Sequence, residues 1–185
     1  MHRLRESIER FHPGCEQERA DKRAMLLALD TAPDTALLRE NLLFHFSASS
    51  MIVNPARTHV LMAYHNIYGT WAWTGGHADG DPDLLAVALR EANEETGISG
   101  LRPLSDDMIS LEALTVQPHV KRGQFVSAHI HLNATFAFES GDTQPIRNKP
   151  DENARVGWLP IAELPSLVTE PDMVAIYQKI LGRIR

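Results

Sequence analysis

Residues 75–98 read GGHADGDPDLLAVALREANEETGI, in which a glycine pair leads into an acidic helical pattern that ends at another glycine. At about 100° per residue, Glu91, Glu94 and Glu95 share one face of the predicted helix. Apolar residues between 85 and 92 lie on a separate arc, which predicts one face packed on a core. Like charges one turn apart destabilise a helix by roughly 0.2–0.5 kcal/mol per pair, so the acidic face indicates a bound cation. A solvated surface is the alternative interpretation.

The ends of this helix carry recognisable signals. Gly97 is expected just beyond its C-terminus, where a left-handed backbone favours glycine. Pro82 suits the first turn because its missing N–H would be unpaired there, and Asp81 is then the expected N-cap. The carboxylate oxygens on this scaffold are hard ligands that suit Mg²⁺ or Mn²⁺.

The same stretch resembles the signature of the Nudix hydrolase family, G-x5-E-x7-R-E-U-x-E-E-x-G-U, in which U is a bulky apolar residue. The residues in register are Gly76, Arg90, Glu91, Glu94, Glu95, Gly97 and Ile98. Pro82 stands where the family has its upstream Glu, and the small Ala92 occupies the first U position. Asp79, Asp81 and Asp83 lie near that upstream position but out of register.

The resemblance implies an α/β (α+β) fold, a Nudix-type α/β/α sandwich with a mixed sheet. It also implies divalent-metal-dependent hydrolysis of a pyrophosphate linkage, in a nucleoside diphosphate linked to another moiety or a related small diphosphate. The implied metal ligands, for Mg²⁺ or Mn²⁺, are Glu91, Glu94, Glu95 and the Gly75 carbonyl. The implied catalytic residues are Glu91, Glu94, Arg90 and Glu152, with Arg90 orienting a glutamate and either Glu91 or Glu152 accepting a proton.

A segment rich in histidine and basic residues is the second candidate feature. Period two places His129 and His131 on the same face of a strand expected over residues 125–138. Phosphoryl chemistry needs positive groups aimed at phosphate oxygens. The expected substrate-binding residues are therefore His77, His119, Lys121, Arg122, His129 and His131. Hydrogen-bonded strand residues are one alternative for the histidines; a zinc site is another, although no Cys accompanies them and no familiar ligand spacing is present.

Composition restricts the class of protein. The chain has 185 residues, 43% of them hydrophobic, a net charge of −6 and one cysteine, Cys15. The acidic balance argues against binding to DNA or to an anionic membrane, whereas a small, nucleotide-like phosphorylated substrate is compatible with a bound cation. No disulfide can form within the chain. No signal-peptide pattern or apolar run of 18 residues is present, so a cytoplasmic location is expected.

The remaining pattern predicts one domain with an extension. Residues 1–41 are interpreted as an N-terminal helical extension with helices over 2–11 and 15–29, and residues 42–185 as the Nudix hydrolase domain. Strands are expected over 42–53, 60–64, 109–116 and 125–138, and a closing helix over 171–184. The extension is expected to be a structural cap, with a lid or dimerisation element as the alternative; a homodimer is kept as a candidate assembly.

Two other functions remain open. A non-catalytic Nudix-fold sensor of a nucleotide or sugar nucleotide would explain the missing Glu at Pro82. An isoprenoid-diphosphate isomerase is known on this fold, but it needs a cysteine near the site, and Cys15 lies far away in the sequence.

Overall fold

The computed structural model describes residues 1–121 and 123–184. Within them, a mixed eight-stranded sheet is built around two long strands, β1 (Phe44–Val53) and β9 (His129–Glu139). These strands pair in parallel along their whole length, from Phe44 opposite Ile130 to Val53 opposite Glu139. The other strands of the sheet are antiparallel to their neighbours: β2 (His59–His65), β3 (Trp71–Ala72), β4 (Thr74–His77), β5 (Arg102–Pro103), β6 (Ser110–Val116) and β10 (Asn153–Pro160).

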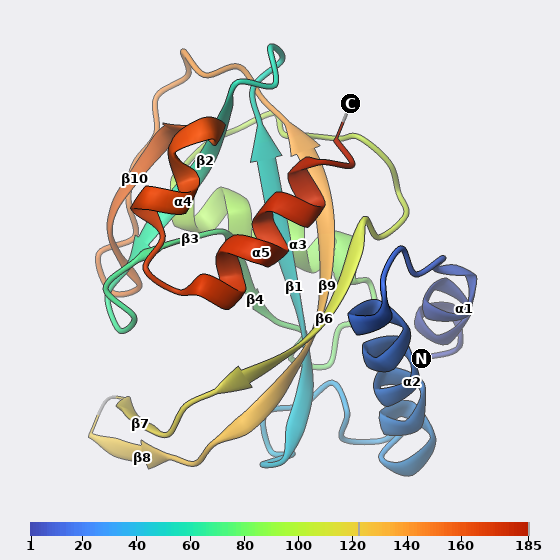
Figure 1. Ribbon diagram of the computed structural model, residues 1–185. Helices are drawn as coiled ribbons and strands as arrows, with labels where there is room; N and C mark the ends of the chain where they lie inside the picture. Colours follow the sequence, from blue (N-terminus) through green and yellow to red (C-terminus); the bar gives the residue numbers. More distant parts are fainter. Residues whose placement is uncertain (122, 185) are drawn as a thin grey trace.

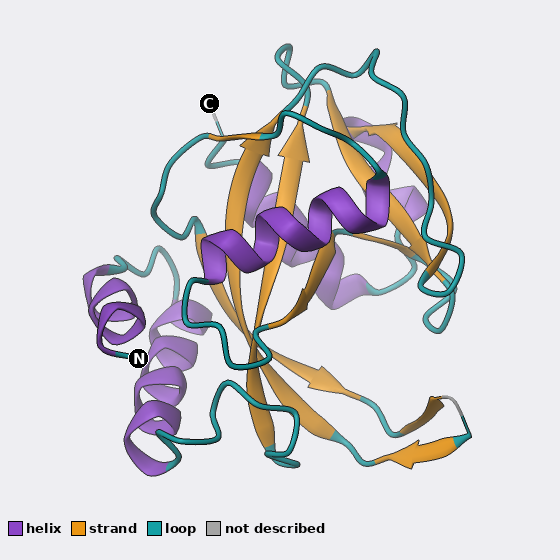
Figure 2. Cartoon of the chain, turned by 180° about the vertical axis from the view of Figure 1, so that it is seen from behind, coloured by secondary structure: helices purple, strands orange, loops and turns teal. Residues whose placement is uncertain are grey.

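Helices cover both faces of the sheet, as the sandwich predicts. Helix α3 (Leu84–Thr96) lies on one face, and α4 (Leu164–Leu167) and α5 (Pro171–Leu181) lie on the other (Figures 1 and 2). A single 3-10 turn (Ile161–Glu163) leads into α4. Every helix in the described part of the chain is too short or too polar to cross a bilayer.

The ends of α3 confirm one sequence expectation and correct another. Gly97 follows the helix with φ of 64°, the left-handed conformation expected there. The N-cap, however, is Asp83 and not Asp81: the Asp83 side chain accepts a hydrogen bond from the Ala86 N–H at 3.1 Å. Pro82 therefore precedes the helix, and the Asp81 carboxylate accepts the Asp83 N–H at 2.9 Å instead.

The apolar side of α3 packs on the sheet through small residues. Ala88 and Ala92 are fully buried, and the Ser50 hydroxyl on β1 donates to the Ala88 carbonyl at 2.8 Å. A bulky residue at position 92 would need more room between helix and sheet. The departure from the family signature at Ala92 is therefore accommodated by a close approach of α3 to β1.

The N-terminal helices α1 (His2–Arg10) and α2 (Glu16–Thr31) contribute to the same core. Their buried apolar residues belong to the cluster that also contains Phe46 and Val87. These residues are Leu4, Ile8, Met25, Ala28 and Leu29. Cys15 precedes α2, with its sulfur 3.8 Å from the Gln17 side-chain oxygen.

The strand expected over residues 125–138 is divided in the structure. Strand β8 (Gln124–Val126) pairs with β7 (His119–Lys121) in a separate hairpin that projects from the main sheet (Figure 1). Residues 127 and 128 separate β8 from β9. Pro118 lacks an N–H and so cannot continue the β6 ladder, which explains why pairing stops at Val116 opposite His129.

Candidate active site

Three carboxylates, two from α3 and one from a distant part of the sequence, converge beside this helix. Glu91 and Glu95 are one turn apart on the helix, and Glu152 comes from the loop before β10. One carboxylate oxygen from each lies within 4.8 Å of the other two. Glu95 is buried, with 5% of the residue exposed, whereas 40% of the Glu152 side chain is exposed. We refer to Glu91, Glu95 and Glu152 as the acidic cluster.

The glycine pair of β4 supports this cluster. The Gly75 N–H donates to Glu95 Oε1 at 2.8 Å, which orients that carboxylate. A Cβ atom at Gly76 would lie only 2.7 Å from Glu91 Cγ, so the side chain of Glu91 occupies the space that any larger residue would need. Gly76 therefore allows β4 and α3 to approach closely, whereas a Cβ at Gly75 would meet β1, at 2.9 Å from Ser49 Cα.

Burial and mutual repulsion disfavour negative charge in the cluster. Burial raises the pKa of Glu95 to about 8, against the opposing effect of the Gly75 N–H. Burial also raises the pKa of Glu91, and the charge of Glu94 raises it further. A divalent cation would offset this repulsion, and the three oxygen ligands fit Mg²⁺ or Mn²⁺ in charge and hardness.

Glu94 and Arg90 lie at the rim of the cluster. The Glu94 side chain is 49% exposed and its Oε2 lies 3.2 Å from Lys149 Nζ, so it stands apart from the three converging carboxylates. Arg90 Nη2 lies 3.5 Å from Glu91 Oε1, and Nη1 lies 3.7 Å from Asp81 Oδ2. The helix thus directs Glu91 and Glu95, but not Glu94, toward Glu152.

Lys149 lies at this site although no sequence pattern predicted it. Its Nζ lies 3.0 Å from Glu152 Oε1 and also contacts Glu94. Burial would lower the pKa of Lys149, but hydrogen bonds to Glu152 and Glu94 outweigh it and raise that pKa. The i, i+3 spacing of Lys149 and Glu152 was the only available signal, and it does not by itself distinguish a site from a surface pair.

No aspartate near Pro82 takes the place of the missing glutamate among the described contacts. Asp79 forms a bidentate ion pair with Arg39. Arg39 Nε donates to Asp79 Oδ1 at 2.6 Å, and Arg39 Nη2 donates to Asp79 Oδ2. Asp83 caps α3, and Asp81 contacts the Asp83 N–H and Arg90.

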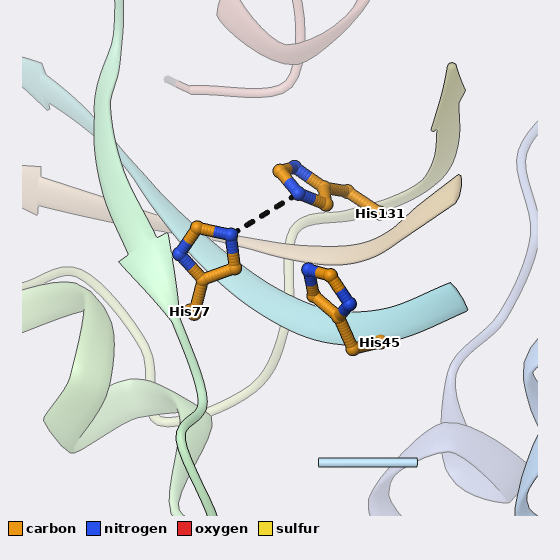
Figure 3. A group of neighbouring side chains, drawn as sticks. All are labelled: His45, His77 and His131. Atoms are coloured by element: carbon orange, nitrogen blue, oxygen red, sulfur yellow. Dashed lines mark hydrogen bonds between the residues drawn. The ribbon is translucent and has the colours of Figure 1, made fainter. Parts of the chain in front are cut away.

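Histidines gather on the other face of β4. Because neighbouring strand residues point to opposite faces, His77 points away from the side on which Gly76 meets Glu91. The His77 ring lies close to those of His131 on β9 and His45 on β1 (Figure 3). His129, also on β9, contacts the rings of His45 and His131. The structure therefore brings three predicted histidines together, but the strand β4 separates them from the acidic cluster.

His45 was not predicted as a site residue. His45, Ser47 and Ser49 alternate with apolar residues along this strand, and this alternation is the sequence signal that could have identified His45. Burial lowers the pKa of His45, and burial together with the neighbouring imidazoles lowers the pKa of His131 to about 2. Both rings are consequently neutral near pH 7.

The other predicted substrate-binding residues lie apart from this group. His119 is on β7, where its Nδ1 lies 2.9 Å from the Gln117 carbonyl oxygen. Lys121 is on the same strand, and its side chain lies outside the described part of the structure, as does residue Arg122.

Comparison with known proteins agrees with this geometry. A NUDIX domain model matches residues 44–181. A search of curated proteins gives no significant match. Among solved structures, an Ap4A hydrolase from C. elegans is similar with a TM-score of 0.57 and 17% identity, over 75% of this chain and 96% of that one.

Two further structures show the same fold. The E. coli dihydroneopterin triphosphate pyrophosphohydrolase has a TM-score of 0.56 at 16% identity, covering 74% of this chain and 94% of its own. The Nudix hydrolase RenU from M. smegmatis has a TM-score of 0.55 at 18% identity, covering 75% and 84%. At such identities the likeness concerns the fold, while the domain match covers most of the chain. The chain belongs to the Nudix family and has the fold of Nudix hydrolases.

Proposed function

We propose that this protein hydrolyses a pyrophosphate linkage in a small, nucleotide-like diphosphate, with Mg²⁺ or Mn²⁺ held by Glu91, Glu95 and Glu152. The observation that carries the proposal is the convergence of these three carboxylates within 4.8 Å on a Nudix scaffold. The pyrophosphohydrolase and the Ap4A hydrolase among the similar structures support the reaction class. When bound, such an ion would neutralise negative charge on the pyrophosphate and lower the pKa of the attacking water.

The residues of the cluster have different tasks in this proposal. Glu95 is a fixed ligand, because it is buried and its Oε1 accepts the Gly75 N–H. Glu91 is also held in place, between Gly76 and Arg90, and its side chain is only 17% exposed. Glu152 is the most exposed of the three at 40%, and Lys149 fixes its orientation. We therefore assign proton acceptance from water to Glu152, and metal holding to all three.

Cations around the cluster complete the proposed site. Lys149 and Arg90 lie beside the carboxylates and offer N–H donors to phosphate oxygens. Glu94 keeps Lys149 at the rim through its 3.2 Å contact. Loss of Glu94 is therefore expected to reduce turnover less than loss of Glu91 or Glu95.

A product assay tests the proposal. The purified chain is incubated with Mg²⁺ and a panel of dinucleoside polyphosphates, nucleotide sugars and other nucleoside diphosphate derivatives, and products are identified by mass spectrometry. Glu91→Gln and Glu95→Gln should lower kcat by roughly 100-fold or more, because metal-assisted acid–base chemistry is lost. Glu16→Gln, at an exposed surface pair with Arg19, is the matched control and should retain full activity.

The sensor remains the second candidate because of one observation. Pro82 stands at the signature's glutamate, and the neighbouring aspartates are committed to other contacts. Calorimetric binding of a panel compound with Mg²⁺, without any product, would favour the sensor and contradict the hydrolase. Full turnover by both folded glutamine variants would reject the metal assignment.

A further inference from the structure

We propose that His45, His77 and His131 form a second metal site, for a transition-metal ion such as Zn²⁺, with His129 as an additional ligand. The site is separate from the acidic cluster and does not depend on the proposed hydrolase activity. One ring nitrogen from each of His45, His77 and His131 lies within 4.8 Å of the other two. Figure 3 shows the three rings turned toward one another.

The ligands come from three neighbouring strands of the sheet. His45 on β1 is the direct register partner of His131 on β9. On the other side of β1, His77 on β4 pairs with Ser47, which shares a strand face with His45. His129 lies two residues before His131 and therefore on the same face. Paired strands hold these side chains more rigidly than loops would, which favours a site with defined geometry.

The nitrogen spacing suits tetrahedral coordination. His131 Nε2 lies 3.2 Å from His77 Nε2 and 3.2 Å from His129 Nε2. A Zn–N bond of about 2.0–2.1 Å places the nitrogens of a tetrahedral site about 3.3–3.4 Å apart. These two contacts are therefore close to the edges of such a tetrahedron, and the ligand nitrogen of His45 lies within 4.8 Å of those of His77 and His131.

Hydrogen bonding among the rings does not account for the arrangement. A ring nitrogen presents either one N–H or one lone pair in its plane. His131 Nε2 can thus satisfy one of its two 3.2 Å neighbours, His77 or His129, but not both. A cation at the centre accepts all of the lone pairs at once.

Main-chain carbonyls set the tautomers needed for metal binding. His129 Nδ1 lies 2.8 Å from the Ser127 carbonyl oxygen, and His45 Nδ1 lies 3.2 Å from that of Asn41. A carbonyl only accepts, so in each neutral ring Nδ1 carries the proton and Nε2 keeps its lone pair. Such carbonyl partners are the usual outer contacts of metal-bound histidines.

His45 gives the independent sign of a ligand. Only 4% of the residue is exposed, and its Nε2 is buried with no hydrogen-bond partner among the described residues. An unsatisfied buried polar atom costs about 1–3 kcal/mol. The cost is removed if Nε2 binds an ion that also contacts His131 and His77.

The donor atoms distinguish this site from the acidic cluster. Neutral imidazole nitrogens suit Zn²⁺, Cu²⁺, Ni²⁺ and Fe²⁺, whereas Mg²⁺ and Mn²⁺ prefer carboxylate oxygens. His77 directly follows Gly76, so β4 lies between the two sites and belongs to both. An ion held by β1, β4 and β9 would link three strands and stabilise the folded state by mass action.

Metal titration of the full chain tests the proposal. Protein stripped with a chelator is titrated with Zn²⁺ by calorimetry and with Co²⁺ by visible absorption, and bound metal is measured by mass spectrometry. We expect one Zn²⁺ per chain, a tetrahedral Co²⁺ spectrum and a rise in Tm with Zn²⁺. Loss of contacts outside the ligand shell already lowers metal affinity about 10–100-fold, so His131→Ala and His77→Ala should each lower it by at least that much.

Two matched variants make the result decisive. His119→Ala removes an imidazole outside the group, and Glu95→Gln alters the acidic cluster; both should bind Zn²⁺ like the wild type. The proposal is overturned if the wild type binds no Zn²⁺, or if binding survives in both His131→Ala and His77→Ala with the fold intact. Loss of Zn²⁺ binding in Glu95→Gln would place the ion at the carboxylates and also reject the histidine site.

Discussion

Two adjacent glycines determine how β4 meets α3. Gly75 presents its N–H to Glu95, and Gly76 leaves room for the Glu91 side chain. The small size of Gly76, and not a special backbone angle, is the property that matters, because only a missing Cβ admits Glu91 at this distance. A single added methyl group should therefore displace a carboxylate of the acidic cluster.

Gly76→Ala tests this requirement. The new Cβ would meet Glu91 Cγ at 2.7 Å, so either the strand or the glutamate must shift. Overpacking of this kind typically costs about 1–3 kcal/mol of unfolding free energy. We also expect Mg²⁺ affinity, measured by calorimetry, to fall at least about 10-fold, because the ligand geometry changes.

Gly141→Ala is the matched control for this substitution. Nothing lies within 4 Å of a Cβ built at Gly141, so both stability and Mg²⁺ affinity should stay near the wild-type values. Equal Mg²⁺ affinity in the Gly76→Ala and Gly141→Ala proteins would show that Glu91 is not a ligand.

At the scale of elements, α2 and α5 are joined by a buried charge network. Glu18 on α2 is fully buried, and its carboxylate contacts Arg183 at 2.6 Å and Lys179 at 3.2 Å. It also accepts hydrogen bonds from the Ser110 hydroxyl and the Gly14 N–H. Burial alone would raise the pKa of Glu18, but these contacts lower it from 4.5 to about 2.

Glu18→Gln should destabilise the protein by about 3 kcal/mol at pH 7, because it leaves Arg183 without its buried carboxylate partner and leaves Lys179 with Glu112 alone. Urea unfolding followed by circular dichroism measures this difference. Glu16→Gln on the same helix is the control; its ion pair with Arg19 is exposed, and no measurable change is expected.

The same pair of proteins gives a pH test with a defined sign. The pKa of Glu18 is lower in the folded state, so its contribution is present above about pH 4.5 and is lost as pH falls toward 2. The stability difference between wild type and Glu18→Gln should therefore shrink over this acidic range. A difference that stays constant from pH 5 to pH 2 would contradict the assigned ion pairs.

At the scale of the whole molecule, the N-terminal extension shares the core of the domain. Met25 and Ile8 are fully buried in the cluster that contains Phe46 of β1 and Val87 of α3. Gln17 also donates to the Leu111 carbonyl at 2.9 Å, which ties α2 to β6. We therefore propose that residues 1–41 act as a structural cap of the domain.

Deletion of residues 1–41 tests the cap. Burying a large aliphatic side chain contributes about 1.5–3 kcal/mol, and the extension provides several such side chains. The chain 42–185 should therefore lose much of its stability, with a strongly lowered Tm or exposure of apolar surface detected by dye binding. An unchanged Tm and a sharp unfolding transition would instead support a lid or dimerisation element.

The sequence by itself determined the family, the acidic helix and its left-handed end at Gly97, because these depend on residue type at fixed local spacing. Helical periodicity also placed Glu91, Glu94 and Glu95 on one face, although it did not distinguish the two members of the acidic cluster from Glu94 at its rim. Period two similarly put His129 and His131 together. Each of these inferences uses contacts within one element, where geometry follows directly from residue number.

Only the tertiary structure decided which residues meet across elements. It separated Glu94 from the acidic cluster and brought Lys149 and Glu152 to α3 from a loop more than 50 residues away. It also joined His45 to His77 and His131 through the pairing of β4 and β9 with β1. Strand order and register are set by packing of the whole sheet, so no local pattern could have shown that these histidines surround one point.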